Sequence, residues 1–149
     1  MARSPTDRAQ VLITVKASPE IGRTHGETVC VAGISLDGDQ RRWIRLFPVQ
    51  WQWFWGKQHP KYQVLDIDVV NHERDQRPES HRPVLDTATV VDQLPSGPRR
   101  ARILNELPQP TMCELVAAKG WSRTSLALVV PRETLSDIMG VAGTDRQFR

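Results

Sequence analysis

The sequence is poor in the residues that hold metals or covalent cross-links. Its 149 residues include only two cysteines, Cys30 and Cys113, which lie far apart. Neither belongs to a Cys-x-x-Cys pair or to a Cys/His ligand spacing, so we expect no zinc site and no metal. Cys30 lies inside an apolar run, which favours a buried free thiol over half of a disulfide.

Short motifs of several enzyme classes are also missing. The sequence has no Walker loop and no dinucleotide-binding glycine fingerprint, so we expect no cofactor. Restriction-type nucleases need an acid followed by an acid-x-lysine triplet, and the sequence contains no such triplet. These absences favour a binding module over an enzyme.

No apolar run is long enough for a membrane span. The first one, VLITV at 11–15, has five residues, too few for a signal peptide or a spanning helix. We therefore expect a cytoplasmic protein without a membrane partner. The formal net charge is +3 and the pI is near 9.2, a balance that permits nucleic-acid binding without requiring it.

Proline and glycine are plentiful instead, with eleven and nine residues, and this argues against a helical bundle. Apolar and β-branched runs predict strands at 11–16, 27–34, 42–47, 62–70, 84–94 and 125–130. Two short helices are expected late in the chain, at 99–107 and at 111–119, the second with Thr111 and Glu114 as a capping box. The pattern predicts a mainly β (α+β) fold, a small curled sheet or barrel of five or six strands.

The strands at 27–34 and 42–47 are the most clearly connected pair. Asp37-Gly38 between them is typical of a tight hairpin turn. Gly33 inside the first strand predicts a bulge or a close approach of another backbone. Pro48 is expected to end the second strand.

The aromatic residues are concentrated between residues 41 and 62. Of five Trp, three Phe and one Tyr, all but Trp121 and Phe148 lie there. The same stretch holds five Arg and Lys residues and no carboxylate. Rings interleaved with cations suit a single-stranded nucleic acid, because bases stack on rings while phosphates pair with Arg or Lys.

Alternation within 42–47 predicts which side chains share a face. In a strand, Ile44 and Leu46 lie on one side while Trp43, Arg45 and Phe47 lie on the other. If the aliphatic pair faces the core, ring, guanidinium and ring form a stacking platform. The alternative is that the rings pack inward and that Arg45 extends past them.

The chain resembles the dual OB-containing domain family of bacteria, which is associated with defence and conflict gene neighbourhoods. The resemblance rests on ETVCVAGI, WIRLFPV, KYQ, DQRPES and SLALVVP, in this order across residues 11–131. It implies an OB-like barrel and, by analogy of fold, nucleic-acid sensing or binding. On this basis we expect a flexible tail at 1–9, an OB-like β-barrel domain at 10–131, and a C-terminal tail or the start of a truncated second unit at 132–149.

The leading hypothesis is a non-enzymatic module that binds single-stranded DNA or RNA. Its candidate binding residues are Trp43, Arg45, Phe47, Arg41, Arg42, Trp51, Trp53, Trp55, Lys57, Lys61, Arg74 and Arg77. One alternative is a protein-interaction or regulatory module that uses the Trp-rich patch, since Trp and Arg also dominate protein hot spots. The remaining alternative is a metal-dependent nuclease using carboxylates and histidines of 66–81. Asp66 and Asp68 face the same way, which fits a blunted strand face better than a metal site.

Overall fold

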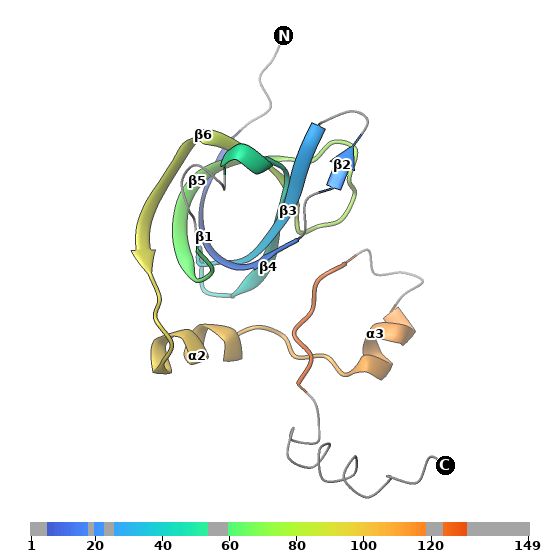
Figure 1. Ribbon diagram of the computed structural model, residues 1–149. Helices are drawn as coiled ribbons and strands as arrows, with labels where there is room; N and C mark the ends of the chain where they lie inside the picture. The colour runs from blue at the N-terminus through green and yellow to red at the C-terminus, as the bar shows by residue number, and fades with distance from the viewer. Residues whose placement is uncertain (1–5, 18–19, 23–25, 54–59, 119–123, 131–149) are drawn as a thin grey trace, which may run out of the picture.

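The computed structural model describes residues 6–17, 20–22, 26–53, 60–118 and 124–130. Six strands dominate it (Figure 1). They are β1 (Asp7–Lys16), β2 (Glu20–Gly22), β3 (Gly26–Ser35), β4 (Arg42–Gln50), β5 (Gln63–Asn71) and β6 (Ser80–Gln93).

Five of these strands close into a barrel. The sheet order is β1-β5-β6-β4-β3-β2, and an additional antiparallel pairing of β1 with β3 completes the ring. Every pair is antiparallel except β4 with β6, which runs parallel over Arg45↔Ser80 and Leu46↔His81. A five-stranded barrel of mixed pairing, with β2 extending its β3 side, is an OB-like arrangement. The mainly β, OB-like barrel predicted from the sequence is therefore confirmed.

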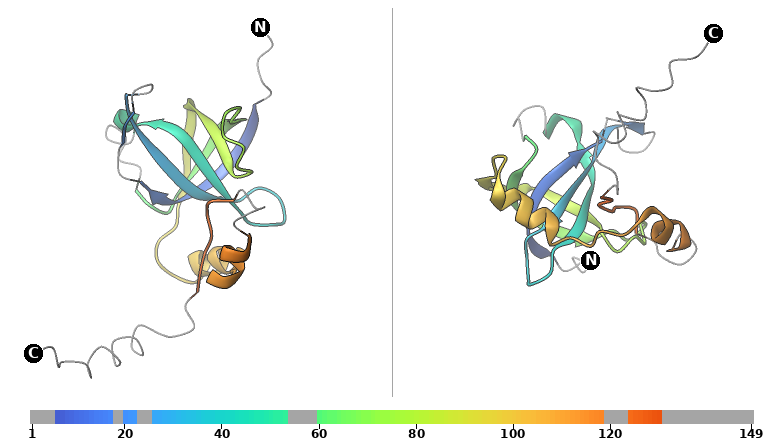
Figure 2. Two further views of the ribbon diagram at one scale, coloured as in Figure 1. Left: turned by 90° about the vertical axis from the view of Figure 1, so that its right-hand side faces the viewer. Right: turned by 90° about the horizontal axis from the view of Figure 1, so that it is seen from below.

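The helices lie together at one end of the barrel (Figures 1 and 2). They are α2 (Pro98–Asn105) and α3 (Met112–Ala118), and the segment 124–130 runs between the two helices. Pro98 starts α2, where its missing N–H costs nothing. Thr111 and Glu114 bond reciprocally at the start of α3, so the predicted capping box is confirmed. No helix in the described ranges has the length and apolar character needed to span a membrane.

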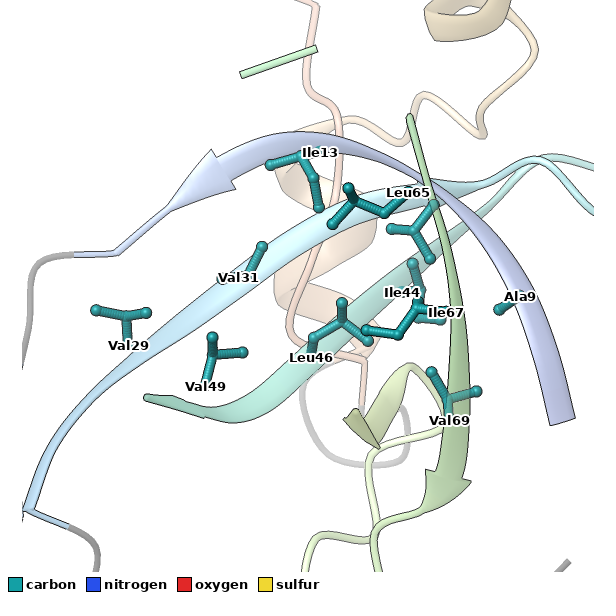
Figure 3. Close-up of a cluster of buried hydrophobic side chains, with 11 residues drawn as sticks. Ala9, Ile13, Val29, Val31, Ile44, Leu46, Val49, Leu65, Ile67 and Val69 are labelled. Carbon is teal, nitrogen blue, oxygen red and sulfur yellow. The ribbon is translucent and has the colours of Figure 1, made fainter. Parts of the chain in front are cut away.

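The barrel interior is filled by aliphatic side chains from β1, β3, β4 and β5 (Figure 3). Ile44 and Leu46 point into it together with Ile13 of β1, and Val11 belongs to the same cluster. Each fully buried side chain of this size contributes roughly 1.5–3 kcal/mol relative to exposure. Burial also continues on the outer side of β1, because Leu12 and Thr14 are covered as well. β1 is therefore buried on both faces from Val11 to Thr14.

A second apolar cluster lies outside the barrel, under α2. It joins Leu12, Ile34 and Val64 of the strands to Ile103 of the helix and Leu107 just after it. Helix α2 therefore covers one outer face of the sheet with its apolar side. Arg99 and Arg102 are exposed, whereas Arg100 lies over the Tyr62 ring and donates to the Leu94 carbonyl at 2.6 Å. Partly buried residues complete the cluster: Leu36, Trp43, Tyr62, Leu104 and Leu128.

The β3–β4 hairpin forms as predicted, with Ser35 opposite Arg42 and Gly38 in the turn at φ 70°. Gly33 also has its predicted role. A Cβ there would lie 2.5 Å from the Leu12 carbonyl oxygen and 2.7 Å from Val11 Cγ1. The β1 backbone passes so close to Gly33 that only glycine fits.

Limits of three predicted strands were wrong, and a further predicted strand is absent. β6 begins at Ser80, four residues before the predicted start. β1 begins at Asp7, because residues 7–9 pair with Ile67–Val69 of β5. These three residues therefore belong to the sheet and not to the expected flexible tail. β4 continues past Pro48, because a register shift between Val29 and Val31 of β3 accommodates a residue without an N–H. Residues 125–130 form no strand, since the β1–β3 pairing closes the barrel and leaves no open edge there.

Substituting Gly33 tests the close approach of β1. We expect Gly33→Ala to lower the free energy of unfolding by about 3 kcal/mol, because the added methyl group overlaps a backbone carbonyl. Urea unfolding followed by circular dichroism measures this loss. Gly38→Ala is the control: its Cβ meets open space, so only the positive φ costs about 1 kcal/mol. An equal loss in both variants would contradict the close approach.

Candidate functional site

The outer face of β4 carries the predicted row of Trp43, Arg45 and Phe47. All three are half-buried, whereas Ile44 and Leu46 between them are buried inside the barrel. The alternation predicted from the sequence is therefore confirmed. What covers the outer row determines whether it can bind anything.

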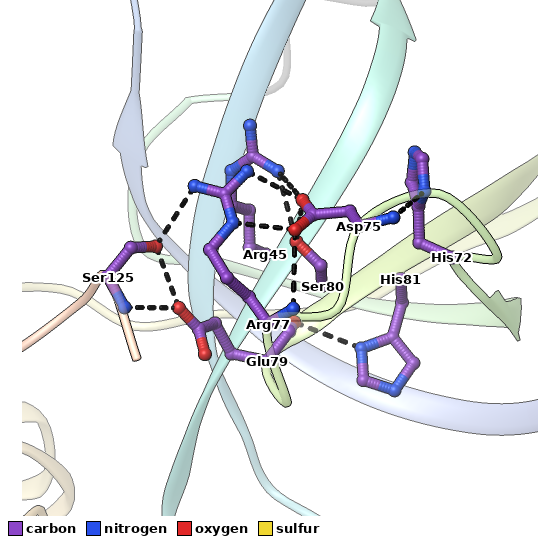
Figure 4. A network of polar contacts seen from close by, with 8 residues as sticks. All are labelled: Arg45, His72, Asp75, Arg77, Glu79, Ser80, His81 and Ser125. Atoms are coloured by element: carbon purple, nitrogen blue, oxygen red, sulfur yellow. Dashed lines mark hydrogen bonds and ion pairs between the residues drawn. The ribbon is translucent and has the colours of Figure 1, made fainter. Parts of the chain in front are cut away.

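Arg45 is engaged by the protein itself (Figure 4). Its Nη1 donates to Asp75 Oδ2 at 2.8 Å and to Ser80 Oγ at 3.0 Å. The guanidinium carbon also lies 4.9 Å from the centre of the Phe47 ring, a cation–π arrangement. With 13% of its side chain exposed, Arg45 fixes the β5–β6 loop to β4.

Asp75 is the centre of that loop. It accepts hydrogen bonds from Arg77 Nε at 2.8 Å and Nη2 at 2.6 Å, and from Ser80 Oγ at 2.6 Å. The hydrogen bonds from Arg77, followed by that from Ser80, hold the pKa of Asp75 far below its usual range, against the opposing effect of burial. His72 stacks on Phe47 and accepts the Asp75 amide N–H. Hydrogen bonds among its own side chains and with Arg45 therefore hold the β5–β6 loop in place.

Glu79 joins this loop to the C-terminal segment. Its side-chain Oε1 accepts from the Ser125 amide at 2.6 Å and from Ser125 Oγ at 2.7 Å (Figure 4). The residue is only 5% exposed. Its other oxygen, Oε2, is buried and has no hydrogen-bond partner in the part of the chain that the structure describes.

A cleft of about 950 Å³ opens beside Glu79. Its walls come from the tip of the β3–β4 hairpin, the end of the β5–β6 loop, and the segments around α3. The lining residues are Asp37, Gly38, Asp39, Gln40, Arg41, Arg42, Trp43, Pro78, Glu79, Pro108, Pro110, Leu115, Thr124, Leu126 and Ala127. Trp43 is the one aromatic ring among them, and its Nε1 is buried without a hydrogen-bond partner in the described ranges.

The remaining arginines and lysines predicted to bind phosphate differ in whether the protein itself supplies them with a partner. Arg41 is held by Glu106 Oε2 at 3.0 Å and by the Leu36 carbonyl at 2.6 Å, so it braces the hairpin. By contrast, Arg42, Lys61 and Arg74 are exposed and form no ion pair with any described residue. Of these three, Arg42 lines the cleft.

Two of the tryptophans after β4 pack against the barrel interior. Trp51 and Trp53 lie in a helical turn and pack against the interior cluster, so their period-two spacing does not extend the strand. Trp55 and Lys57 lie outside the described residues. The structure therefore brings Trp43 and Arg42 together at the cleft and places Trp51 and Trp53 elsewhere.

Asp66 and Asp68 lie on the outer face of β5, where both bind Arg8 at 2.9 Å. No group of three or more His, Cys, Asp or Glu that could hold a metal ion occurs among the described residues. The sequence analysis included Glu79 among the carboxylates of the nuclease alternative and did not place it beside the cleft. The DQRPES stretch was the available signal, since it contains Asp75, Arg77, Glu79 and Ser80.

Comparison with known proteins gives one match. The sequence model of a domain family of unknown function, DUF8758, matches residues 7–106. The chain belongs to this family. No curated protein and no solved structure matches it. The matched range runs from the start of β1 to the residue after α2, so it includes the barrel wall of the cleft and excludes the wall formed by 108–127.

Removing the charge of Asp75 tests the loop network. We expect Asp75→Asn to lower the free energy of unfolding at pH 7 by about 2 kcal/mol, because Arg45 and Arg77 both lose their anion. Urea unfolding measures the loss. Asp86→Asn, the same change at an exposed position of β6, should have almost no effect.

The pH dependence has a defined sign. Because folding lowers the pKa of Asp75, its contribution is complete above the unfolded value of 3.8 and falls as pH drops below it. The stability difference between the wild type and Asp75→Asn should therefore shrink between pH 5 and pH 2. A difference that stays constant over this range contradicts the assignment.

Proposed function

We propose that this domain is a non-enzymatic module that binds single-stranded nucleic acid in the cleft beside the β3–β4 hairpin. The observation that carries the proposal is the position of the cleft on an OB-like barrel. Proteins of this architecture bind oligonucleotides on the face of their second and third barrel strands and with the loop between the fourth and fifth. Here these are β3, β4 and the β5–β6 loop, which supply Arg42, Trp43 and Glu79 to the cleft.

Charge supports the same site. Arg42 lies in the cleft wall, is exposed, and forms no ion pair with a described residue, so it is available to a phosphate. Arg74 is exposed in the β5–β6 loop and offers a further phosphate contact. Trp43 supplies an aromatic surface for a base.

The other predicted contacts take a different part in this proposal. Arg45 and Arg77 are occupied by Asp75, so they position the β5–β6 loop instead of reaching a phosphate. Phe47 supports Arg45 and stacks on His72. The ligand would therefore contact residues around the tip of the β3–β4 hairpin. Arg45 and Phe47 would hold the β5–β6 loop in position beside it.

Binding of fluorescent 15-mers of DNA and RNA at several salt concentrations tests the proposal. We expect tryptophan emission to change on binding and the affinity to fall as salt rises. Arg42→Ala should weaken binding and reduce the slope of log affinity against log salt by about 0.7, the loss of one phosphate contact on a single strand. Arg99→Ala removes an equal charge outside the cleft, where Arg99 pairs with Asp92, and should leave the slope unchanged.

Absence of binding at low salt would reject the nucleic-acid function. The protein-interaction alternative would then gain support from α3, where Met112 and Val116 are 60% and 67% exposed and no residue is buried. The cytoplasmic location and the bacterial defence context expected from the resemblance stay predictions.

A further inference from the structure

We propose that residues 124–130 form a movable strap at the edge of the cleft, and that Ser125 is the latch that holds this strap against Glu79. The strap then controls the entry of a ligand. That role rests on the proposed function and adds a gate to it, whereas the movement of the strap can be measured without any ligand. The inference comes from the space around the strap and from the contacts that hold it.

The strap borders two open spaces. Thr124, Leu126 and Ala127 line the cleft of about 950 Å³, and the same three residues line a second hollow of about 440 Å³. Helix α3 contributes Val116 and Ala118 to this hollow, and the described residues that line it carry no charge. Protein interiors are normally close-packed, so an apolar space of this size leaves the strap room to move toward α3.

Few apolar contacts hold the strap in place. Leu128 is partly buried against the cluster under α2, whereas Val130 is 58% exposed. Residues 124–130 join no strand ladder with any described residue, and α3 buries none of its own side chains. Segments with few buried contacts and no ladder have low local stability, and the lids of binding sites are drawn from such segments.

Ser125 supplies the polar contact between the strap and the barrel (Figure 4). Its amide and its hydroxyl both donate to Glu79 Oε1, at 2.6 and 2.7 Å, and Glu79 itself is buried. Arg77 Nη1 also donates to Ser125 Oγ, at 3.3 Å. Hydrogen bonds to a carboxylate are stronger than those between neutral groups, so this latch supplies much of what holds the strap.

The two spaces define two positions of the strap. In the structure the latch is made, and the hollow separates the strap from α3. In the second position the latch is broken, the strap fills the hollow, and the cleft is wider. Leu126 and Val129 then bury apolar surface against α3, which offsets the loss of the latch. A segment with two alternative packings of this kind is a common form of switch.

Hydrogen exchange followed by mass spectrometry tests the latch on the protein alone. We expect Ser125→Ala to speed the exchange of the amides of 124–130 about ten-fold, because the strap loses its hydroxyl bond to Glu79. Exchange in the barrel strands should stay the same. Ser125→Thr keeps a hydroxyl group and should exchange at the wild-type rate. Equal rates in the wild type and Ser125→Ala overturn the latch.

Filling the hollow tests the movement. Ala118→Leu adds apolar volume on the side of α3, so the strap can no longer bury Leu126 there. We expect the amides of 124–130 to exchange about five-fold slower and a fluorescent thymidine 15-mer to associate more slowly. Ala117→Leu is the same change at an exposed position of α3 that lines neither space, and it should keep both wild-type rates.

The outcomes separate the gate from the proposed function. If the variants exchange as expected but the 15-mer does not bind at low salt, the proposed function and the gate fall and the movement stands. If the 15-mer binds and Ala118→Leu changes neither rate, the moving strap is overturned and the proposed function stands. Circular dichroism checks folding; if Ala118→Leu fails to fold, the comparison of Ser125→Ala with Ser125→Thr decides the result.

Discussion

The parallel contact between β4 and β6 is the constraint on which the barrel depends. Only two residue pairs are in register there, Arg45 with Ser80 and Leu46 with His81. The side chain of Arg45 bonds Ser80 and Asp75 across the same seam, and the Arg45 amide donates to the Glu79 carbonyl at 2.7 Å. A short backbone ladder is thus strengthened by a half-buried ion pair. The contacts that hold β4 against β6 therefore also fix the position of the β5–β6 loop.

Features that depend on near neighbours were predictable from the sequence. The hairpin around Asp37-Gly38, the capping box at Thr111 and the two faces of 42–47 follow from local spacing, and all three are present. A small barrel was predicted as well, because many short strands and few helices leave few alternatives, and its OB-like form was what the family resemblance implied.

Long-range partners were not predictable. Arg45 finds Asp75 thirty positions away, across a whole strand, and no local pattern encodes this pairing. The same limit applies to Glu79 and Ser125, which are forty-six positions apart. Trp51 and Trp53 were expected among the binding residues, yet they lie in a helical turn and pack against the barrel core. The pattern of aromatic residues next to cations therefore pointed to the strand that borders the cleft, and it did not reveal that Trp51 and Trp53 pack against the barrel core.

The composite construction of the cleft has an evolutionary consequence. One wall belongs to the barrel and lies within the family match, whereas the other wall lies outside it and is lined by Pro108, Pro110, Leu115, Thr124, Leu126 and Ala127. The interior cluster of the barrel contains none of these residues, because it comes from the strands and from residues near them. Substitutions in the outer wall can therefore change the shape of the cleft while the barrel core keeps its packing. Under the proposed function, such substitutions would change the ligand preference without rebuilding the fold.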